Sequence, residues 1–271
     1  MGQKRIVILT VRGMIGDQTA TFMRTALDHL RENKPAAIVL RVESQGGGLG
    51  ASDRVWHHLD EFKKETGVPI VASFGDMAAS GGYYVAMPSD HIVAEPTTMT
   101  GSIGAVVRGY VLQDLMEKVG VHPVTIPSSN ATDKTVLSSE NKEDWEEGGV
   151  TYETWRKFLD SGHERFVKIV QEGRSEHYPS IEAIWHAGVA TGMVFTADEA
   201  VDKKLVDSVG YLDDAIAEAE KLAGIAADEK APVTYIAAPV PLITQLLGTK
   251  AEGDIPWPAL DDRLGENLRN Q

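Results

Sequence analysis

The chain has 271 residues, 42% hydrophobic and 24% charged, a balance typical of a globular protein with one substantial core. Its formal net charge of −14 argues against nucleic acid or an anionic membrane as a partner, and the absence of cysteine excludes disulfides, thiol catalysis and cysteine-ligated metals. No apolar run approaches the roughly 20 residues of a membrane helix, so we expect membrane association only through an anchor absent from this chain. Composition does not decide the compartment: the chain could be a cytoplasmic protein or the body of a membrane-anchored protein whose anchor was removed.

The first part of the chain alternates between apolar runs and segments of helical periodicity. Strands are predicted at 5–11, 36–42 and 69–74, and helices at 17–33 and 51–67. This alternation, with short glycine-containing turns, indicates βαβ units and a mostly parallel sheet. Ligand sites in such sheets lie beyond the carboxyl ends of strands. Two glycine-rich turns, 44–50 and 75–82, follow predicted strands.

The second part of the chain is predicted to be mainly helical. After an apolar run (91–96) and a turn (97–107), the pattern predicts helices at 112–119, 141–174 (interrupted at Gly148-Gly149), 181–188 and 196–205, then a short strand and a closing helix within 206–225. After Ala226 the composition changes to short apolar patches between prolines. We therefore expect one domain at 1–226 and a C-terminal arm at 227–271 that makes oligomer contacts.

The turn FGDMAASGGYY (74–84) carries a candidate nucleophile, Ser80. It joins two apolar runs and is built from small residues, a pattern that predicts strand, tight turn and helix. Backbone N–H groups at a helix start lack intrahelical partners and can stabilise an oxyanion, while glycines let a substrate backbone come close. The alternative is that Ser80 only caps the helix, as serines often do.

The glycine cluster SQGGGLG (44–50) is the second candidate feature. It lacks the Lys-Ser/Thr of a P-loop and does not match GxGxxG, so phosphate binding is disfavoured. Successive glycines after a strand suit a cradle of backbone N–H groups for a tetrahedral intermediate. A flexible turn would have the same composition.

A serine nucleophile needs a base, and the sequence offers two types. None of the eight histidines lies in a glycine-rich turn or a recognisable pairing. A lysine can serve when burial lowers its pKa from about 10.4 to ~5–6, and Ser–Lys pairs are an established arrangement. Lys134 stands alone in a polar loop, 128–140, where a solvated surface lysine is the other interpretation.

These segments together resemble the signal peptide peptidase A (SppA/SohB-type) serine peptidases, relatives of the Clp and crotonase folds. The likeness covers about residues 5–225, and four segments carry it: RVESQGGGLGAS (41–52), MAASGGYYVAMPSDHIVAEPTTMTGSIGAV (77–106), SNATDKTV (129–136) and EAVDKKLVDSVGYLDDAIAEAEKLAG (199–224). The segment around Ser80 is the most specific. The resemblance implies an α/β Clp/crotonase-like domain of repeated ββα/βαβ units with a C-terminal extension.

The resemblance also implies roles for individual residues. Ser80 would be the nucleophile, and Lys134, which lies 54 positions later, the general base. The oxyanion hole would use the N–H of Gly81 with that of Gly46 or Gly47. Ser102 would hold the lysine amine.

Several family features differ or are absent here. Gln45 and Gly48 replace the family's usual proline and serine, which could soften the oxyanion loop, and segment 188–192 lacks the arginine often seen in GRVxTG. The family's N-terminal anchor is missing.

The resulting expectation is a Ser–Lys serine endopeptidase that cleaves extended peptides, such as signal-peptide remnants or misfolded segments, by acyl-enzyme hydrolysis. It would need no cofactor or metal, would not bind nucleic acid, and would form the family's ring-like homo-oligomer. Two alternatives remain open: a crotonase-type acyl-CoA enzyme, or a non-catalytic oligomeric scaffold of the same fold.

Overall fold

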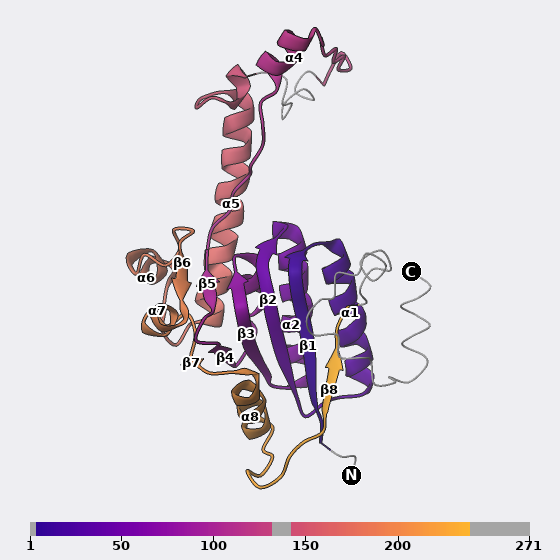
Figure 1. The fold of residues 1–271 in the computed structure, drawn as a ribbon, viewed down its shortest axis with the longest axis vertical. Coiled ribbons are helices and arrows are strands. Elements are labelled where there is room, and N and C mark those ends of the chain that lie inside the picture. The colour runs from indigo at the N-terminus through magenta and orange to yellow at the C-terminus, as the bar shows by residue number, and fades with distance from the viewer. Residues whose placement is uncertain (1–3, 132–141, 239–271) are drawn as a thin grey trace.

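An eight-stranded sheet organises the chain in the computed structural model, which describes residues 4–131 and 142–238. Its strands are β1 (Ile6–Ile15), β2 (Ala37–Gly47), β3 (Ile70–Ala79), β4 (His91–Ala94), β5 (Met99–Gly101), β6 (Val194–Thr196), β7 (Ser208–Val209) and β8 (Val233–Ile236). The main path runs β6-β5-β3-β2-β1-β8, and β4 pairs with β3 and β7 (Figure 1). All pairings are parallel except β5 with β6.

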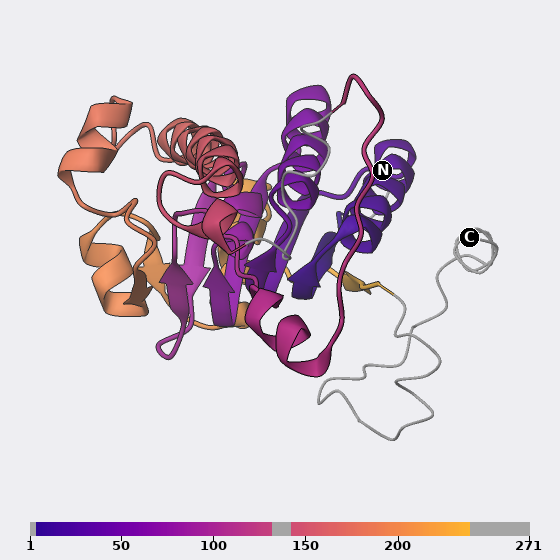
Figure 2. The same cartoon turned by 90° about the horizontal axis from the view of Figure 1, so that it is seen from above.

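Helices cover both faces of this sheet. They are α1 (Asp17–Glu32), α2 (Leu49–Thr66), α3 (Gly81–Val85), α4 (Gln113–Val119), α5 (Val150–Gly173), α6 (Ile181–His186), α7 (Ala197–Asp202) and α8 (Leu212–Leu222), with a 3₁₀ turn, η2, at Glu143–Trp145. Alternate residues of β1 point to opposite sides, as expected for a strand. Val7 and Leu9 join the core shared with α1, α2 and α5, whereas Ile6 and Ile8 join a smaller cluster under α8. Figure 2 shows α1 and α2 side by side on one face.

The third strand changes neighbours along its length. It pairs with β4 up to Phe74 and with β5 from Met77, and its register against β2 shifts between these two points. Such irregularities bend a strand and re-aim the residues that follow. This bend lies just before Ser80.

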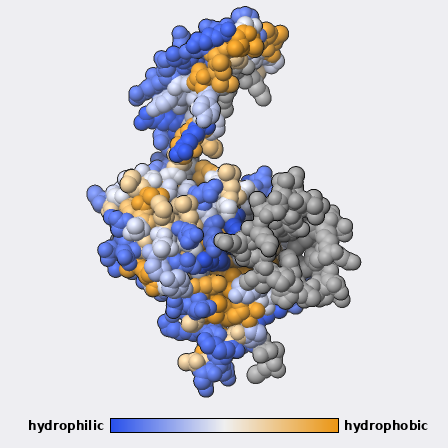
Figure 3. Space-filling model, in the orientation of Figure 1, coloured by the Kyte–Doolittle hydropathy of each residue, from blue (hydrophilic) through white to orange (hydrophobic). Residues whose placement is uncertain are grey.

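A long arm projects from the domain (Figure 1). It contains α4, η2 and the outer part of α5, and its outer end shows apolar surface (Figure 3). Exposed apolar side chains of the arm include Tyr110, Leu115, Val119, Val124 and Ile126. None of the helices within the described ranges is both long and apolar enough to cross a membrane.

The structure confirms the predicted parallel α/β arrangement and most of its elements. Two differences have a common cause, namely short strands stabilised by distant partners. The predicted turn at 97–107 contains β5, which pairs with β3 and β6. In the expected C-terminal arm, β8 pairs with β1, matching Ile6 with Val233. The start of that segment thus adds a strand to the sheet, while 239–271 lie outside the described residues.

Candidate active site

Ser80 occupies a strained backbone position between β3 and α3. Its φ is 52°, in a region that residues other than glycine rarely adopt. Its N–H donates to the Gly101 carbonyl (2.8 Å), and its carbonyl accepts from the Tyr84 N–H (2.9 Å). Its side chain makes no capping hydrogen bond to α3. Ser80 is therefore the N-cap residue of α3 through its backbone, but its hydroxyl does not serve as the cap.

The neighbouring glycines are required by close packing around this serine. A Cβ on Gly46, whose φ is +103°, would lie 2.7 Å from the Gly81 nitrogen and 2.8 Å from the Ser80 Cβ. On Gly81 it would lie 2.3 Å from the Ser52 hydroxyl, and on Gly82 2.6 Å from the Ser44 carbonyl oxygen. The two glycine clusters found in the sequence are therefore packed directly against each other.

Two backbone nitrogens, those of Gly47 and Gly81, lie close to Ser80. Gly81 is the first residue of α3, so its N–H has no intrahelical partner. The Gly47 nitrogen lies 3.2 Å from where a Gly81 Cβ would be. The Gly46 N–H instead donates to the Ser44 hydroxyl (3.0 Å). Of the two glycines considered for the second oxyanion donor, Gly47 thus has the more suitable geometry.

The N-terminal end of α2 lies next to these groups. This 18-residue helix begins at Leu49, directly after the glycines, and its dipole places partial positive charge there. Its N-cap is Gly48, which has extended backbone and no side chain to cap the helix. The Gln45 side chain is exposed.

Ser102 lies beside Ser80 because their strands are paired in register. Ala79 of β3 matches Gly101 of β5, and each serine follows its strand directly. Ser102 also has φ of 52°, and its N–H donates to the Met193 carbonyl (2.7 Å). Both serines line the same cavity.

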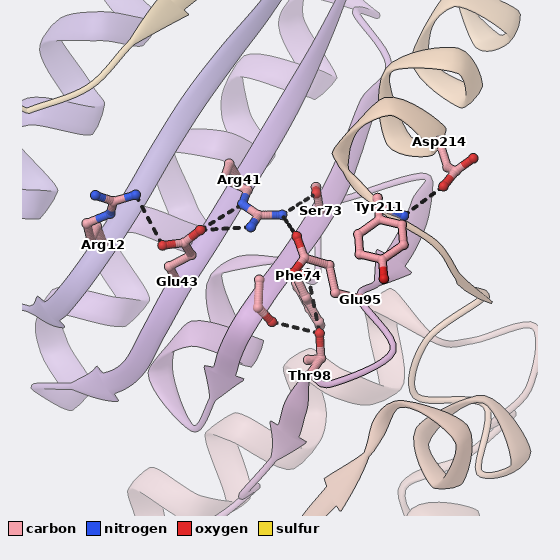
Figure 4. Close-up of polar contacts among 10 residues, drawn as sticks. Arg12, Arg41, Glu43, Ser73, Phe74, Glu95, Thr98, Tyr211 and Asp214 are labelled. Carbon is pink, nitrogen blue, oxygen red and sulfur yellow. Dashed lines mark hydrogen bonds and ion pairs between the residues drawn. The ribbon is translucent and has the colours of Figure 1, made fainter. Parts of the chain in front are cut away.

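Polar contacts hold the bend in β3 (Figure 4). The buried Thr98 hydroxyl donates to the Gly75 carbonyl at 2.7 Å. Arg41 lies against Gly75, since a Cβ there would be 2.6 Å from its guanidinium. Arg41 contacts Glu43 (2.8 Å), Ser73 (3.1 Å) and Glu95 (2.7 Å), and Glu43 also pairs with Arg12 (3.2 Å). This network joins β1, β2, β3 and the segment after β4, and so fixes the strand that presents Ser80.

Figure 4 also shows a capping contact at the start of α8, where the Tyr211 N–H donates to the Asp214 carboxylate (2.7 Å).

A cavity of about 710 Å³ opens onto Ser80, and we call it the Ser80 cavity. Its lining comes from the glycine loop, the start of α2, the serine turn, the segment after β5 and one side of α5. The lining residues are Gly47, Gly48, Leu49, Ser52, Ser80, Gly81, Tyr84, Ser102, Gly104, Ala105, Val106, Val107, Arg108, Trp155, Phe158, Leu159, His163, Phe166, Thr191 and Gly192.

The walls of the Ser80 cavity are tied together by Asp53 of α2. It accepts the Tyr84 hydroxyl of α3 (2.5 Å) and pairs with Arg165 of α5 (3.0 Å). Burial, followed by the hydrogen bond to Asp53, raises the pKa of Tyr84, so this phenol stays protonated. Tyr84 also packs against Phe166, with ring centroids 4.8 Å apart. The three helices therefore form one unit around the cavity.

Lys134, the expected base, lies outside the described residues. The described residues that flank it, Ala131 and Lys142, belong to the arm, and the Lys142 N–H donates to Gln113 of α4 (2.8 Å).

Three cavity residues were missed by the sequence analysis: Ser52, Trp155 and His163. Each has a buried polar side-chain atom without a hydrogen-bond partner. Trp155, Leu159 and His163 are spaced four residues apart, so they lie along one side of α5. That spacing is visible in the sequence, but it does not reveal whether the side faces a core or a cavity.

This fold and site define an α/β protein with a serine on a strained turn at the start of a helix. The serine hydroxyl does not cap that helix, and backbone nitrogens lie beside it. The chain belongs to peptidase family S49, whose family model matches residues 62–226. It is 34% identical over 263 residues to "Putative protease slr0021" of Synechocystis sp., covering 97% of this chain and 88% of that protein. It is also 34% identical to "Serine protease SPPA, chloroplastic" of Arabidopsis thaliana, covering 80% of this chain but only 31% of that protein.

Solved structures agree on the fold. The 1510-N membrane-bound stomatin-specific protease, solved as a lysine-to-alanine variant with a substrate peptide, matches with a TM-score of 0.54 at 13% identity, covering 91% of this chain and 97% of that one. A variant of ClpP1 from Listeria monocytogenes matches with a TM-score of 0.50 at 16% identity, covering 77% and 93%. The expected Clp/crotonase-like fold and the likeness to SppA are thus confirmed.

Proposed function

We propose that this chain is a serine endopeptidase with a Ser80–Lys134 dyad. The observation that carries the proposal is the position of Ser80. Its backbone is strained, its hydroxyl makes no capping hydrogen bond, and it lies beside the Gly47 and Gly81 nitrogens in the Ser80 cavity. Family membership supports peptide hydrolysis as the reaction.

In the proposed reaction, the Ser80 hydroxyl oxygen attacks the scissile carbonyl carbon while its proton passes to the neutral amine of Lys134. The N–H groups of Gly47 and Gly81 donate to the resulting oxyanion, where such donors contribute most. The C–N bond then breaks, and the leaving amine takes the proton from Lys134. Water, activated by the same lysine, hydrolyses the Ser80 ester and restores both groups.

The assignment of Lys134 rests on sequence and on a structural relative. The stomatin-specific protease has been solved both as a serine-to-alanine variant and as a lysine-to-alanine variant, the latter with a substrate peptide. In this chain Ser102, adjacent to Ser80 through the β3–β5 pairing, is the proposed hydroxyl that orients the amine. The proposed substrates are extended peptides, such as signal-peptide remnants or segments of misfolded proteins.

Assembly forms a second part of the proposal. We propose that the C-terminal segment 227–271 and the projecting arm (α4, η2 and the outer part of α5) both contact other copies of the chain in a ring-like homo-oligomer. Tyr110 and Ile126 of the arm are each 87% exposed, and large apolar groups displayed together commonly mark a contact surface. The flanks of Lys134 belong to this arm, so contact between copies would also influence the site.

The test is peptide hydrolysis by Ser80→Ala, with Ser161→Ala as the matched control because Ser161 is an exposed serine of α5 outside the cavity. Loss of one member of a cooperating catalytic unit costs several orders of magnitude in rate. We expect Ser80→Ala to remain folded and lose hydrolysis, and Ser161→Ala to match the unsubstituted protein. A folded Ser80→Ala protein that cleaves peptides at the original rate would refute the assignment.

A further inference from the structure

The two proposed oxyanion donors belong to the starts of two different helices. Gly47 is the last residue of β2 and precedes α2, which begins at Leu49, whereas Gly81 is the first residue of α3. The Gly47 nitrogen lies 3.2 Å from where a Cβ on Gly81 would be. Because both donors must lie within hydrogen-bond distance of one oxygen, the geometry of the oxyanion hole depends on how α3 is held against α2.

The helix α3 is too short to fix its own position. It has five residues, Gly81–Val85, and a helix of that length is held by tertiary contacts more than by its own hydrogen bonds. The residue before it, Ser80, has φ of 52°, a conformation that persists only where the surroundings enforce it. The contacts of α3 therefore determine both the strained serine and the place of the Gly81 N–H.

Tyr84 joins the serine turn to α2. Its backbone N–H donates to the Ser80 carbonyl (2.9 Å), and its hydroxyl donates to Asp53 near the start of α2 (2.5 Å). Tyr84 is 1% exposed. Beside Asp53, the Ser52 hydroxyl oxygen lies 2.3 Å from where a Cβ on Gly81 would be, so the two helices touch at Gly81 and are hydrogen-bonded through Tyr84.

We propose that Tyr84 is a positioning residue for the oxyanion hole, because its hydrogen bond to Asp53 holds α3 against α2 and keeps the Gly47 and Gly81 nitrogens at the spacing that one oxyanion needs. The proposal rests on the proposed peptidase function and adds to it a residue that takes no part in making or breaking bonds.

Asp53 is fixed in turn by Arg165 of α5. The two side chains form an ion pair at 3.0 Å, and the Arg165 guanidinium lies over the Trp56 ring, 5.0 Å from its centroid. A hydrogen bond to a carboxylate is stronger than one between neutral groups, which suits a contact that must hold a short helix. Asp53 also keeps its charged partner when the Tyr84 hydroxyl is removed, so Tyr84→Phe tests the hydrogen bond without isolating a charge.

The neighbouring residue, Tyr83, offers a matched control. Its hydroxyl is buried and donates to the Leu205 carbonyl at 2.7 Å, and Tyr83 does not line the Ser80 cavity. Tyr83→Phe removes the same atom from the same short helix, but the lost hydrogen bond leads to the segment after α7 instead of α2. Both variants keep their rings, so we expect comparable losses of stability and different losses of activity.

The experiment measures kcat and KM for one peptide, and the inhibition constant of the matching peptide aldehyde. The Ser80 oxygen adds to the aldehyde carbon, the hydroxyl proton passes to the proposed base Lys134, and the carbonyl oxygen becomes an oxyanion without any leaving group. Since an oxyanion hole binds this state and not the intact peptide, Tyr84→Phe should lower kcat and aldehyde affinity about 10-fold and change KM less than about 2-fold. Tyr83→Phe should keep all three values within about 2-fold.

Two further measurements test the contact itself. Hydrogen–deuterium exchange in α3 should be faster in Tyr84→Phe than in Tyr83→Phe, because only the former releases the helix from α2. Asp53→Asn keeps an acceptor oxygen for the Tyr84 hydroxyl, whereas Asp53→Ala removes it, and both leave Arg165 without its partner. We therefore expect Asp53→Asn to retain more of the original kcat than Asp53→Ala.

Equal kcat values in the two tyrosine variants, or equal exchange in α3, would overturn the positioning role. A loss confined to KM would also contradict it, since Tyr84 would then act only as part of the cavity wall. Exchange separates this proposal from the peptidase, because it needs no activity. An original protein that neither cleaves peptides nor binds the aldehyde contradicts the peptidase, while exchange still decides whether Tyr84 holds α3 to α2. Hydrolysis that Tyr84→Phe leaves unchanged contradicts the positioning role alone.

Discussion

Substitution of Gly46 by alanine tests whether the glycine loop sets the position of Ser80. Two penalties add at this residue. A φ of +103° is unfavourable for alanine by about 1–3 kcal/mol. The new methyl group would lie 2.7 Å from the Gly81 nitrogen and 2.8 Å from the Ser80 Cβ, and forced overpacking typically costs a further 1–3 kcal/mol.

The matched control is Gly67→Ala, at the opposite end of α2. Gly67 has φ of +68°, but a Cβ there would meet nothing within 4 Å. It therefore carries only the conformational penalty, about 1–2 kcal/mol. We expect Gly46→Ala to lower the free energy of unfolding by about 2–6 kcal/mol, clearly more than the control.

The two variants should differ even more in activity. Relief of the overlap at Gly46 must displace the serine turn, and a misplacement of about 1 Å can reduce a rate about 100-fold. Chemical unfolding and peptide hydrolysis on the same preparations measure both effects. Gly46→Ala with the stability of the Gly67 control and near-original kcat/KM would refute the view that this glycine positions Ser80.

Three further predictions follow from other parts of the chain. Burial alone would raise the pKa of Asp207, but the hydrogen bonds and charge of Arg174 outweigh it, so this pKa lies below its usual value. Its stabilisation should be complete above the unfolded-state pKa of about 3.9 and decrease as pH falls through the folded-state value, and urea unfolding across pH should show a shallower acid dependence in Asp207→Asn. That variant should also lose about 3–5 kcal/mol at neutral pH, because Arg174 is left buried without its charge partner, and an unchanged stability would contradict this. Lys134→Arg should be nearly as inactive as Lys134→Ala, because arginine keeps the charge but cannot release a proton, and substantial hydrolysis by it would indicate another base such as His163. Truncation after residue 238 keeps β8 and should lower the oligomer mass, measured by light scattering, without unfolding the domain, whereas an unchanged mass would show that 239–271 do not hold the assembly together.

The sequence predicted the elements whose pattern is local. The strands that become β1, β2 and β3 are continuous apolar runs, and the turn at Ser80 consists of small residues between two of them, so both could be identified from neighbours along the chain. The packing of Gly46 against Gly81 follows because β2, which contains Gly46, and β3, which ends just before the serine turn, are adjacent and parallel.

The elements that were missed depend on distant partners. β5 has three residues and β8 four, too few for a periodic pattern, and β8 exists through its pairing with the other end of the described chain. The polar atoms of Trp155 and His163 were missed for a related reason. Helical spacing identifies a common side of α5, but only the packing of α5 beside α2 and α3 turns that side into a cavity wall.

The proposed acyl-enzyme chemistry of Ser80 is tested most directly by covalent labelling with a serine-directed acylating probe, mapped by peptide mass spectrometry. We predict a single labelled site at Ser80, loss of peptide hydrolysis in proportion to labelling, and no labelling in Ser80→Ala. Complete inhibition with the label on another residue, or labelling of Ser80 that leaves hydrolysis unchanged, would contradict the assignment of Ser80 as the nucleophile.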